Sequence, residues 1–84
     1  MKKVRMYSMD WCPYCRRAEQ LLHEKGVPFE KVSVENMPDL YKEMVRISGR
    51  RTVPQIFVGD VHIGGYDDLA ELDADGELDE MLAD

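Results

Sequence analysis

Two cysteines separated by two residues, Cys12 and Cys15, are the side chains of this 84-residue sequence best suited to chemistry. Pro13 follows Cys12 directly and favours the first position of a helix, where its missing N–H would be unpaired anyway. Cys12 would then be the helix N-cap, with its sulfur facing the unpaired backbone N–H groups of Tyr14 and Cys15. Because such hydrogen bonds and the helix dipole favour an anion, we predict that Cys12 is a reactive thiolate.

The second cysteine is predicted to have a different role. Cys15 lies one helical turn later, on the face expected to hold Ala18 and Leu22, so its thiol is expected to be less exposed and less ionised. Cys12 would attack a disulfide to form a mixed disulfide, and Cys15 would resolve it by closing a Cys12–Cys15 bridge.

Two structural roles are also open to a cysteine pair of this spacing. A zinc site would need further ligands, and the other candidates, His23 and His62, lack the spacing of known zinc motifs. A purely structural disulfide would stabilise the fold little, because closing so short a loop removes little chain entropy. The redox role is therefore favoured, and no metal is expected.

Composition argues against several other functions. The sequence has a net charge of -6, and binding to nucleic-acid phosphates requires a surplus of lysine and arginine that it lacks. No nucleic-acid partner is therefore expected. No apolar run approaches the roughly 20 residues that span a bilayer, and no apolar segment of a signal peptide follows Met1–Lys3. We therefore expect a cytoplasmic protein without membrane contact, in which the acidic residues 67–84 form a solvated surface.

The first half of the chain has the pattern of a βαβ unit that would position the cysteines. Strand-like segments at Lys3–Ser8 and Phe29–Val34 flank a helical segment that begins at Pro13 and is expected to stop at Gly26. The two strands are predicted to be parallel.

The second half combines a packing helix, a hairpin and a helical end. A helix is predicted over Pro38–Ser48, with Gly49 as its stop. Gln55–Val58 and Val61–Ile63 flank Gly59-Asp60, a two-residue signal for an antiparallel hairpin. Beyond it, helical spacing over 67–84 is interrupted near Gly76 and predicts one or two short helices. No repeat or linker is visible, so residues 1–84 are expected to form one domain.

Three segments of the sequence resemble the motifs of bacterial dithiol glutaredoxins, in the same order and at compatible separations. They are Cys12-Pro13-Tyr14-Cys15, Thr52-Val53-Pro54 and Gly64-Gly65-Tyr66-Asp67-Asp68-Leu69. The resemblance covers essentially the whole chain. It implies an α/β protein of the thioredoxin-like fold, with a four-stranded mixed sheet flanked by three to four helices. The implied activity is glutathione-dependent reduction of glutathione mixed disulfides and protein disulfides by a monomer.

The resemblance also implies a glutathione site. Pro54 would follow a cis peptide bond, and the backbone of Val53 would pair with the glutathione peptide. Asp68 is the candidate partner of the γ-glutamyl ammonium, and Arg51 is a candidate for the glycine carboxylate. The full set of implied binding residues is Tyr14, Arg51, Thr52, Val53, Pro54, Gly65, Tyr66, Asp67 and Asp68.

Simpler roles remain open for three parts of this set. The Asp67-Asp68 pair stands where a helix begins and could serve only as a cap. Tyr14 could be rim packing rather than an aromatic wall beside the active sulfur, and Arg51 could be a solvated side chain.

One position departs from the family pattern. Many glutaredoxins have a lysine three residues before the first cysteine, whereas this chain has Met9, so positive charge is missing there. Arg16, Arg17 or Arg51 could compensate. Trp11, which precedes Cys12, is expected to form a partly exposed lip of the site.

Two further functions are compatible with the cysteine pair. An electron donor reduced by thioredoxin reductase would use the same chemistry with another partner, although the segment Gly64–Leu69 argues for glutathione. A carrier of a two-iron two-sulfur cluster between two protomers is disfavoured by Pro13, because cluster-carrying relatives commonly have a smaller or more flexible residue there.

Overall fold

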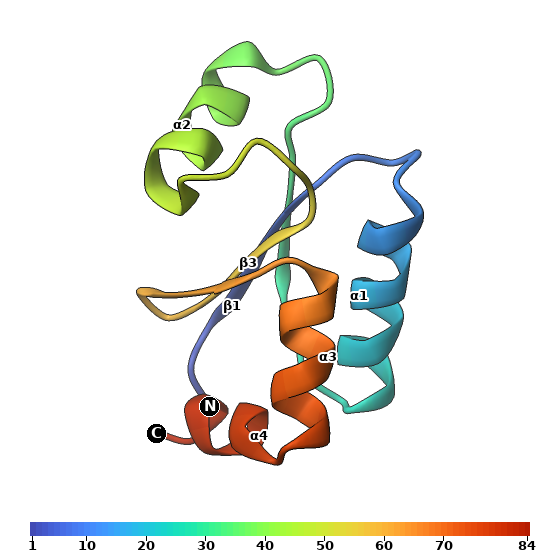
Figure 1. The fold of residues 1–84 in the computed structure, drawn as a ribbon, viewed down its shortest axis with the longest axis vertical. Helices are drawn as coiled ribbons and strands as arrows, with labels where there is room; N and C mark the ends of the chain where they lie inside the picture. The colour runs from blue at the N-terminus through green and yellow to red at the C-terminus, as the bar shows by residue number, and fades with distance from the viewer.

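A four-stranded mixed sheet lies at the centre of the computed structural model, which describes residues 1–84 (Figure 1). Its strands are β1 (Val4–Ser8), β2 (Glu30–Ser33), β3 (Gln55–Val58) and β4 (Val61–Gly64), in the spatial order β2-β1-β3-β4. The pair β1–β2 is parallel, and the pairs β1–β3 and β3–β4 are antiparallel. The predicted mixed sheet, its parallel pair and its hairpin are therefore confirmed.

Four helices accompany the sheet: α1 (Pro13–Glu24), α2 (Pro38–Ser48), α3 (Tyr66–Ala74) and α4 (Glu77–Leu82). Helix α2 ends as predicted, because Gly49 adopts a left-handed conformation with φ of 72° that a glycine reaches without strain. Helix α1 ends earlier than predicted, with Lys25 as its C-cap before Gly26. The acidic end of the chain forms two short helices that are separated at Gly76.

Strand boundaries differ slightly from the sequence prediction. Lys3, Phe29 and Val34 lie just outside their strands, and β4 continues one residue further, to Gly64. The backbone of Val34 still donates a hydrogen bond to the Ser8 carbonyl at 2.9 Å, so only the regular ladder ends early.

Apolar side chains form two clusters on opposite faces of the sheet, because successive residues of a strand point to opposite sides. Val4 and Met6 belong to one cluster, whereas Tyr7 belongs to the other. The first cluster joins the sheet to α1, α3 and α4 through Val4, Met6, Ala18, Leu22, Val27, Ile56, Val58, Ile63, Leu69, Leu78 and Leu82. The second joins it to α2 through Tyr7, Val34, Met44 and Phe57.

The three motifs of the sequence meet at one edge of the sheet. Since β1 and β3 are antiparallel, the end of β1 lies beside the start of β3, and Tyr7 is paired with Gln55. Gly64, at the end of β4, is paired with Ile56 at the same edge. The two termini lie together at the other end of the molecule (Figure 1), where the Met1 ammonium is 2.6 Å from an Asp84 carboxylate oxygen. Every helix in the structure is too short or too polar to cross a membrane.

Candidate active site

Cys12 is the N-cap of α1, as its position before Pro13 predicts. Its backbone is extended, with φ of -82° and ψ of 116°, and its sulfur accepts a hydrogen bond from the backbone N–H of Cys15 at 3.2 Å. The second predicted donor, the N–H of Tyr14, makes no such bond. On its other side the Cys12 thiol donates to the Val53 carbonyl, with 3.6 Å between sulfur and oxygen. The sulfur therefore lies between the start of α1 and the loop before β3.

Both cysteines are free thiols, and both are buried. Cys15 is fully inaccessible and Cys12 is 4% exposed, so the predicted order of exposure is confirmed but the difference is small. Cys12 is therefore more deeply covered than the sequence indicated, and its thiol meets the carbonyl of Val53 in the loop before β3. Burial raises the pKa of the Cys15 thiol to about 12, so this thiol is protonated at neutral pH.

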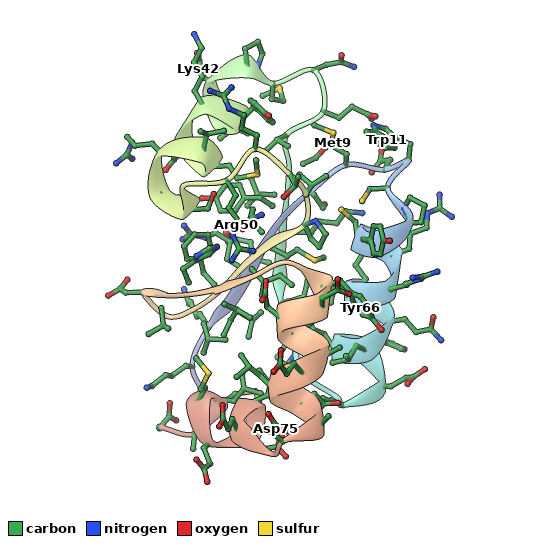
Figure 2. All side chains as sticks on the ribbon, in the orientation of Figure 1. Met9, Trp11, Lys42, Arg50, Tyr66 and Asp75 are labelled. Carbon is green, nitrogen blue, oxygen red and sulfur yellow. The ribbon has the colours of Figure 1, made fainter.

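Exposed aromatic side chains flank the sulfurs. Trp11, labelled in Figure 2, is 66% exposed, and Tyr14 is 51% exposed. The ring of Tyr14 lies 6.4 Å from that of Tyr66, measured between centroids, so aromatic side chains of two separate motifs lie close together. The Arg17 guanidinium lies 5.3 Å from the Tyr14 ring centroid, a cation–π arrangement that places positive charge beside this ring.

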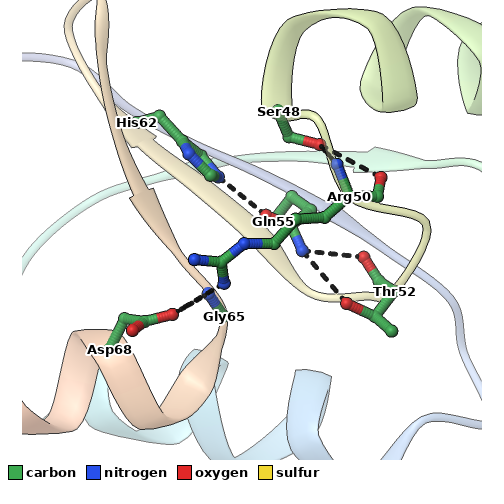
Figure 3. Close-up of polar contacts among 7 residues, drawn as sticks. All are labelled: Ser48, Arg50, Thr52, Gln55, His62, Gly65 and Asp68. Atoms are coloured by element: carbon green, nitrogen blue, oxygen red, sulfur yellow. Dashed lines mark hydrogen bonds and ion pairs between the residues drawn. The ribbon is translucent and has the colours of Figure 1, made fainter.

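The loop before β3 is held by a buried amide that sequence reasoning missed (Figure 3). The Val53–Pro54 peptide bond is cis, which confirms what the family resemblance implied. Gln55, which is fully buried, donates through Nε2 to the carbonyl and the hydroxyl of Thr52, at 2.9 and 3.3 Å. A glutamine at the start of an otherwise apolar strand was the available signal, since buried polar groups are nearly always hydrogen-bonded.

His62, on β4, completes this network. Its Nε2 lies 2.7 Å from Oε1 of Gln55. Because the Gln55 oxygen can only accept, the network assigns the proton to Nε2 of the histidine. Burial lowers the pKa of His62, and the nearby positive charge of Arg50 lowers it further, which keeps the ring neutral at pH 7.

Asp68 is the centre of a second polar cluster, at the start of α3. One of its oxygens accepts from the backbone N–H of Gly65 at 2.9 Å and from the Arg50 guanidinium at 2.9 Å (Figure 3). The hydrogen bond from Gly65, and then the one from Arg50, hold the pKa of this carboxyl below its usual value. The predicted capping role is thus confirmed for Asp68, although Gly65 is the N-cap and Asp68 bonds back to it from the third helical position. Asp67 is exposed.

The arginine that meets this cluster is Arg50, which sequence reasoning did not single out; Arg51 was predicted for another role, at the glycine carboxylate of glutathione. Arg51 is exposed, and its carbonyl accepts a hydrogen bond from the Tyr41 hydroxyl at 2.8 Å, while its side chain forms no ion pair. No periodic pattern shows which residue of a loop faces Asp68, so the contact of Arg50 could not be predicted from the sequence.

Comparison with known proteins agrees with this geometry. A family model described as Glutaredoxin matches residues 4–63. The chain belongs to the glutaredoxin family. Glutaredoxin 3 of Escherichia coli is 49% identical over 82 residues, which cover 98% of this chain and 99% of that protein.

Two solved structures show the same thioredoxin-like fold. A glutaredoxin from Brucella melitensis is 48% identical, with a TM-score of 0.87 over 98% of this chain and 89% of that one. A buckwheat glutaredoxin–glutathione complex is 31% identical, with a TM-score of 0.88 over 96% of this chain and 76% of that one. As a glutaredoxin, the chain is a thiol–disulfide oxidoreductase.

Met9 of this glutaredoxin is half-buried and packs against the apolar cluster beneath α2. It therefore contributes packing where many relatives have a charge. Two of the arginines predicted to replace the missing positive charge have other contacts. Arg16 donates hydrogen bonds to the Asp10 carbonyl at 3.3 and 3.4 Å, and Arg17 lies over the Tyr14 ring.

A hollow of about 390 Å³ lies away from the cysteines of the glutaredoxin. It is lined by Met1–Arg5, Pro28–Glu30 and Gly59, at the opposite end of β1. Because it contains no thiol, we assign the redox chemistry to the edge of the sheet that holds Cys12.

Gly64 provides the space that Asp68 and Arg50 occupy, so Gly64→Ala is expected to disturb the site. A Cβ at this position would lie 2.8 Å from Cγ of Asp68 and 3.0 Å from the Arg50 guanidinium, on a backbone with φ of 121°. We expect a loss of about 1–3 kcal/mol in the free energy of unfolding and a severalfold rise in KM for glutathione substrates.

Chemical denaturation and steady-state kinetics would measure the two effects. Gly26→Ala is the control, because Gly26 also has a positive φ but a Cβ added there would meet no atom within 4 Å. Gly26→Ala is expected to lower stability while leaving KM unchanged. An unchanged KM in Gly64→Ala would contradict a role for the Asp68 geometry.

Proposed function

We propose that this glutaredoxin reduces glutathione mixed disulfides, and some protein disulfides, with electrons from glutathione. Cys12 is the nucleophile and Cys15 the resolving thiol. The observation that carries this proposal is the hydrogen bond of 3.2 Å from the Cys15 backbone to the Cys12 sulfur at the start of α1. When the acceptor is a thiolate this bond is charge-assisted and stronger, so the helix start favours the reactive form.

Glutathione would bind across the three segments that surround Cys12. The backbone of Val53, held by the loop of Thr52 and Pro54, would pair with the peptide as an added strand does. Tyr14 and Tyr66 would form the wall beside the sulfur. Gly65, Tyr66 and Asp67 would present the N-terminal N–H groups of α3 to the γ-glutamyl carboxylate. The glycine carboxylate would meet the exposed Arg51.

Asp68 would hold the γ-glutamyl ammonium. In the free protein its oxygen is shared by Gly65 and Arg50, and the side chains of Arg50 and Asp68 are 47% and 41% exposed. An ion pair this exposed is worth about 0–1 kcal/mol, so the ammonium can displace Arg50 at little cost.

The chemistry consists of thiol–disulfide exchanges. The Cys12 thiolate attacks the glutathione sulfur of a mixed disulfide, and the substrate protein leaves as a thiolate. A second glutathione thiolate then attacks the glutathione sulfur bound to Cys12, which releases oxidised glutathione and restores Cys12. With a protein disulfide as substrate, Cys15 instead attacks Cys12, and the substrate leaves reduced.

The cellular compartment that we propose follows from the electron donor, glutathione. Glutathione keeps thiols reduced in the cytosol, where we propose that this protein acts as a monomer on glutathionylated and disulfide-containing proteins.

A reduction assay with two alternative electron sources tests the proposal. With a glutathionylated peptide as substrate, glutathione plus glutathione reductase is expected to support turnover. Thioredoxin reductase as the only electron source is expected to support none. Turnover with thioredoxin reductase alone would favour the alternative electron-donor function, and a lack of turnover with glutathione would refute the proposal.

A further inference from the structure

Ser8 carries the one buried side-chain oxygen or nitrogen in the structure that lacks a hydrogen-bond partner. The residue is fully inaccessible to solvent. A buried hydroxyl is nearly always paired, because removing it from water without a partner is costly. Ser8 lies at the end of β1, immediately before the active-site turn. The presence of an unpaired buried hydroxyl at this position therefore needs an explanation.

The fold directs Ser8 toward the resolving cysteine. Val4 and Met6 project from β1 into the cluster that contains Ala18 and Leu22 of α1. Ser8 is the next residue on the same face of the strand, since side chains alternate. One turn before Ala18, on the same buried face of α1, is Cys15.

The backbone around Ser8 is fixed by hydrogen bonds to β2 and to the start of the cysteine motif. The Ser8 carbonyl accepts from Val34 at 2.9 Å, and the Met9 carbonyl accepts from Cys12 at 3.3 Å, so both ends of this short segment are held (Met9 is labelled in Figure 2). The backbone of Met9, the residue after Ser8, also acts to lower the pKa of Cys15.

The other groups that act on Cys15 oppose its ionisation. Burial is the largest cause of its raised pKa, and the neighbouring Cys12 and Glu19 add to it. Resolution nevertheless requires the Cys15 thiolate, because the thiol is not the nucleophile in disulfide exchange. A further hydrogen-bond donor at the Cys15 sulfur would therefore stabilise the thiolate that resolution requires.

We propose that the Ser8 hydroxyl donates a hydrogen bond to the Cys15 sulfur as it becomes a thiolate and attacks the mixed disulfide on Cys12. The inference rests on the proposed function. Cys15 gives up its proton, a Cys15–Cys12 bond forms, the bond between Cys12 and the substrate sulfur breaks, and the departing substrate thiolate takes up a proton. The substrate sulfur leaves with the electron pair and is reduced, while the two cysteines are oxidised to a disulfide.

The lack of a partner for the Ser8 hydroxyl in the reduced protein is what this role requires. A donor that is unpaired with the thiol and paired with the thiolate stabilises the transition state more than the ground state. Only such a difference accelerates a step. A hydrogen bond to a charged acceptor is also stronger than one to a neutral acceptor.

The test compares Ser8→Ala, Ser8→Thr and Ser8→Val. Thr and Val have nearly the same shape, but only Thr keeps the hydroxyl. Reduced protein is mixed with oxidised glutathione, and closure of the Cys12–Cys15 bond is followed by the fluorescence of Trp11, the single tryptophan of the chain. Each closure rate is measured as a function of pH, and monothiol reduction of a glutathionylated peptide, which needs Cys12 alone, is measured in parallel.

We expect closure to slow about tenfold in Ser8→Ala and Ser8→Val, with the pH of half-maximal rate shifted upward. Ser8→Thr is expected to close like the wild type, and all three variants are expected to keep monothiol activity. Unchanged closure rates and pH profiles in Ser8→Ala and Ser8→Val would overturn the inference, as would equal loss of both activities, which would indicate a structural role. If the wild type itself lacks monothiol activity with glutathione, the proposed function fails rather than the role of Ser8.

Discussion

Cys12→Ser is expected to lower glutathione-dependent reduction of a glutathionylated peptide by about 10³-fold or more, while Cys15→Ser retains activity within a few-fold. The difference follows from which atoms surround the Cys12 sulfur. Its hydrogen bond comes from the backbone N–H of residue 15, not from the Cys15 side chain, so a serine at position 15 keeps it. A serine hydroxyl at position 12 would be in the same place but is not a nucleophile toward disulfides at neutral pH.

Two measurements complete this prediction. Cys15→Ser is expected to lose reactions that require the internal disulfide, which a protein-disulfide substrate would detect. Thermal unfolding of both variants checks that each is folded. Activity that survives in Cys12→Ser and disappears in Cys15→Ser would reverse the assignment of nucleophile and resolving thiol.

Local sequence signals predicted most of the fold. Pro13 marks the start of α1 and Gly49 the end of α2, because each residue has a backbone preference that acts without help from distant residues. Gly59-Asp60 likewise predicted the β3–β4 hairpin.

Parts of the candidate site depend on contacts between residues that are distant in the chain. These contacts could not be predicted from the sequence. Arg50 meets Asp68 across 18 positions of the chain, and Gln55 meets His62 across the hairpin. The Cys12 thiol meets the carbonyl of Val53, 41 residues away. Propensity and periodicity describe a residue and its near neighbours, so they located the helices and strands. The family resemblance located the three motifs, and neither source predicted the polar bonds between them.

Asp68→Asn is expected to raise KM for glutathione substrates about 10- to 100-fold and to change kcat little, because a hydrogen bond to a charged group is worth about 1.5–3 kcal/mol. The asparagine oxygen can still accept from the Gly65 backbone, so the cap on α3 and the stability of the fold are expected to persist. Steady-state kinetics with a varied glutathionylated substrate would measure the effect.

The pH dependence of this effect has a defined sign. Because the hydrogen bonds from Gly65 and Arg50 lower the pKa of Asp68, the carboxylate stays charged below its usual titration range. Its stabilising contribution is present above the ordinary aspartate pKa of about 3.9 and is lost only as the pH falls through the lower folded value. The difference in KM between wild type and Asp68→Asn is therefore expected to persist from pH 7 down to about pH 5.

Asp75→Asn is the matched control, since it removes one negative charge from the exposed far end of the same helix, where Asp75 forms no ion pair (Figure 2). A double-mutant cycle with Arg50→Gln separates two explanations for any loss. If Asp68 acts on the ligand ammonium, Asp68→Asn raises KM equally in the Arg50→Gln background. If it acts only by holding Arg50, the substitution has no effect there, and the ammonium site assigned to Asp68 would be wrong.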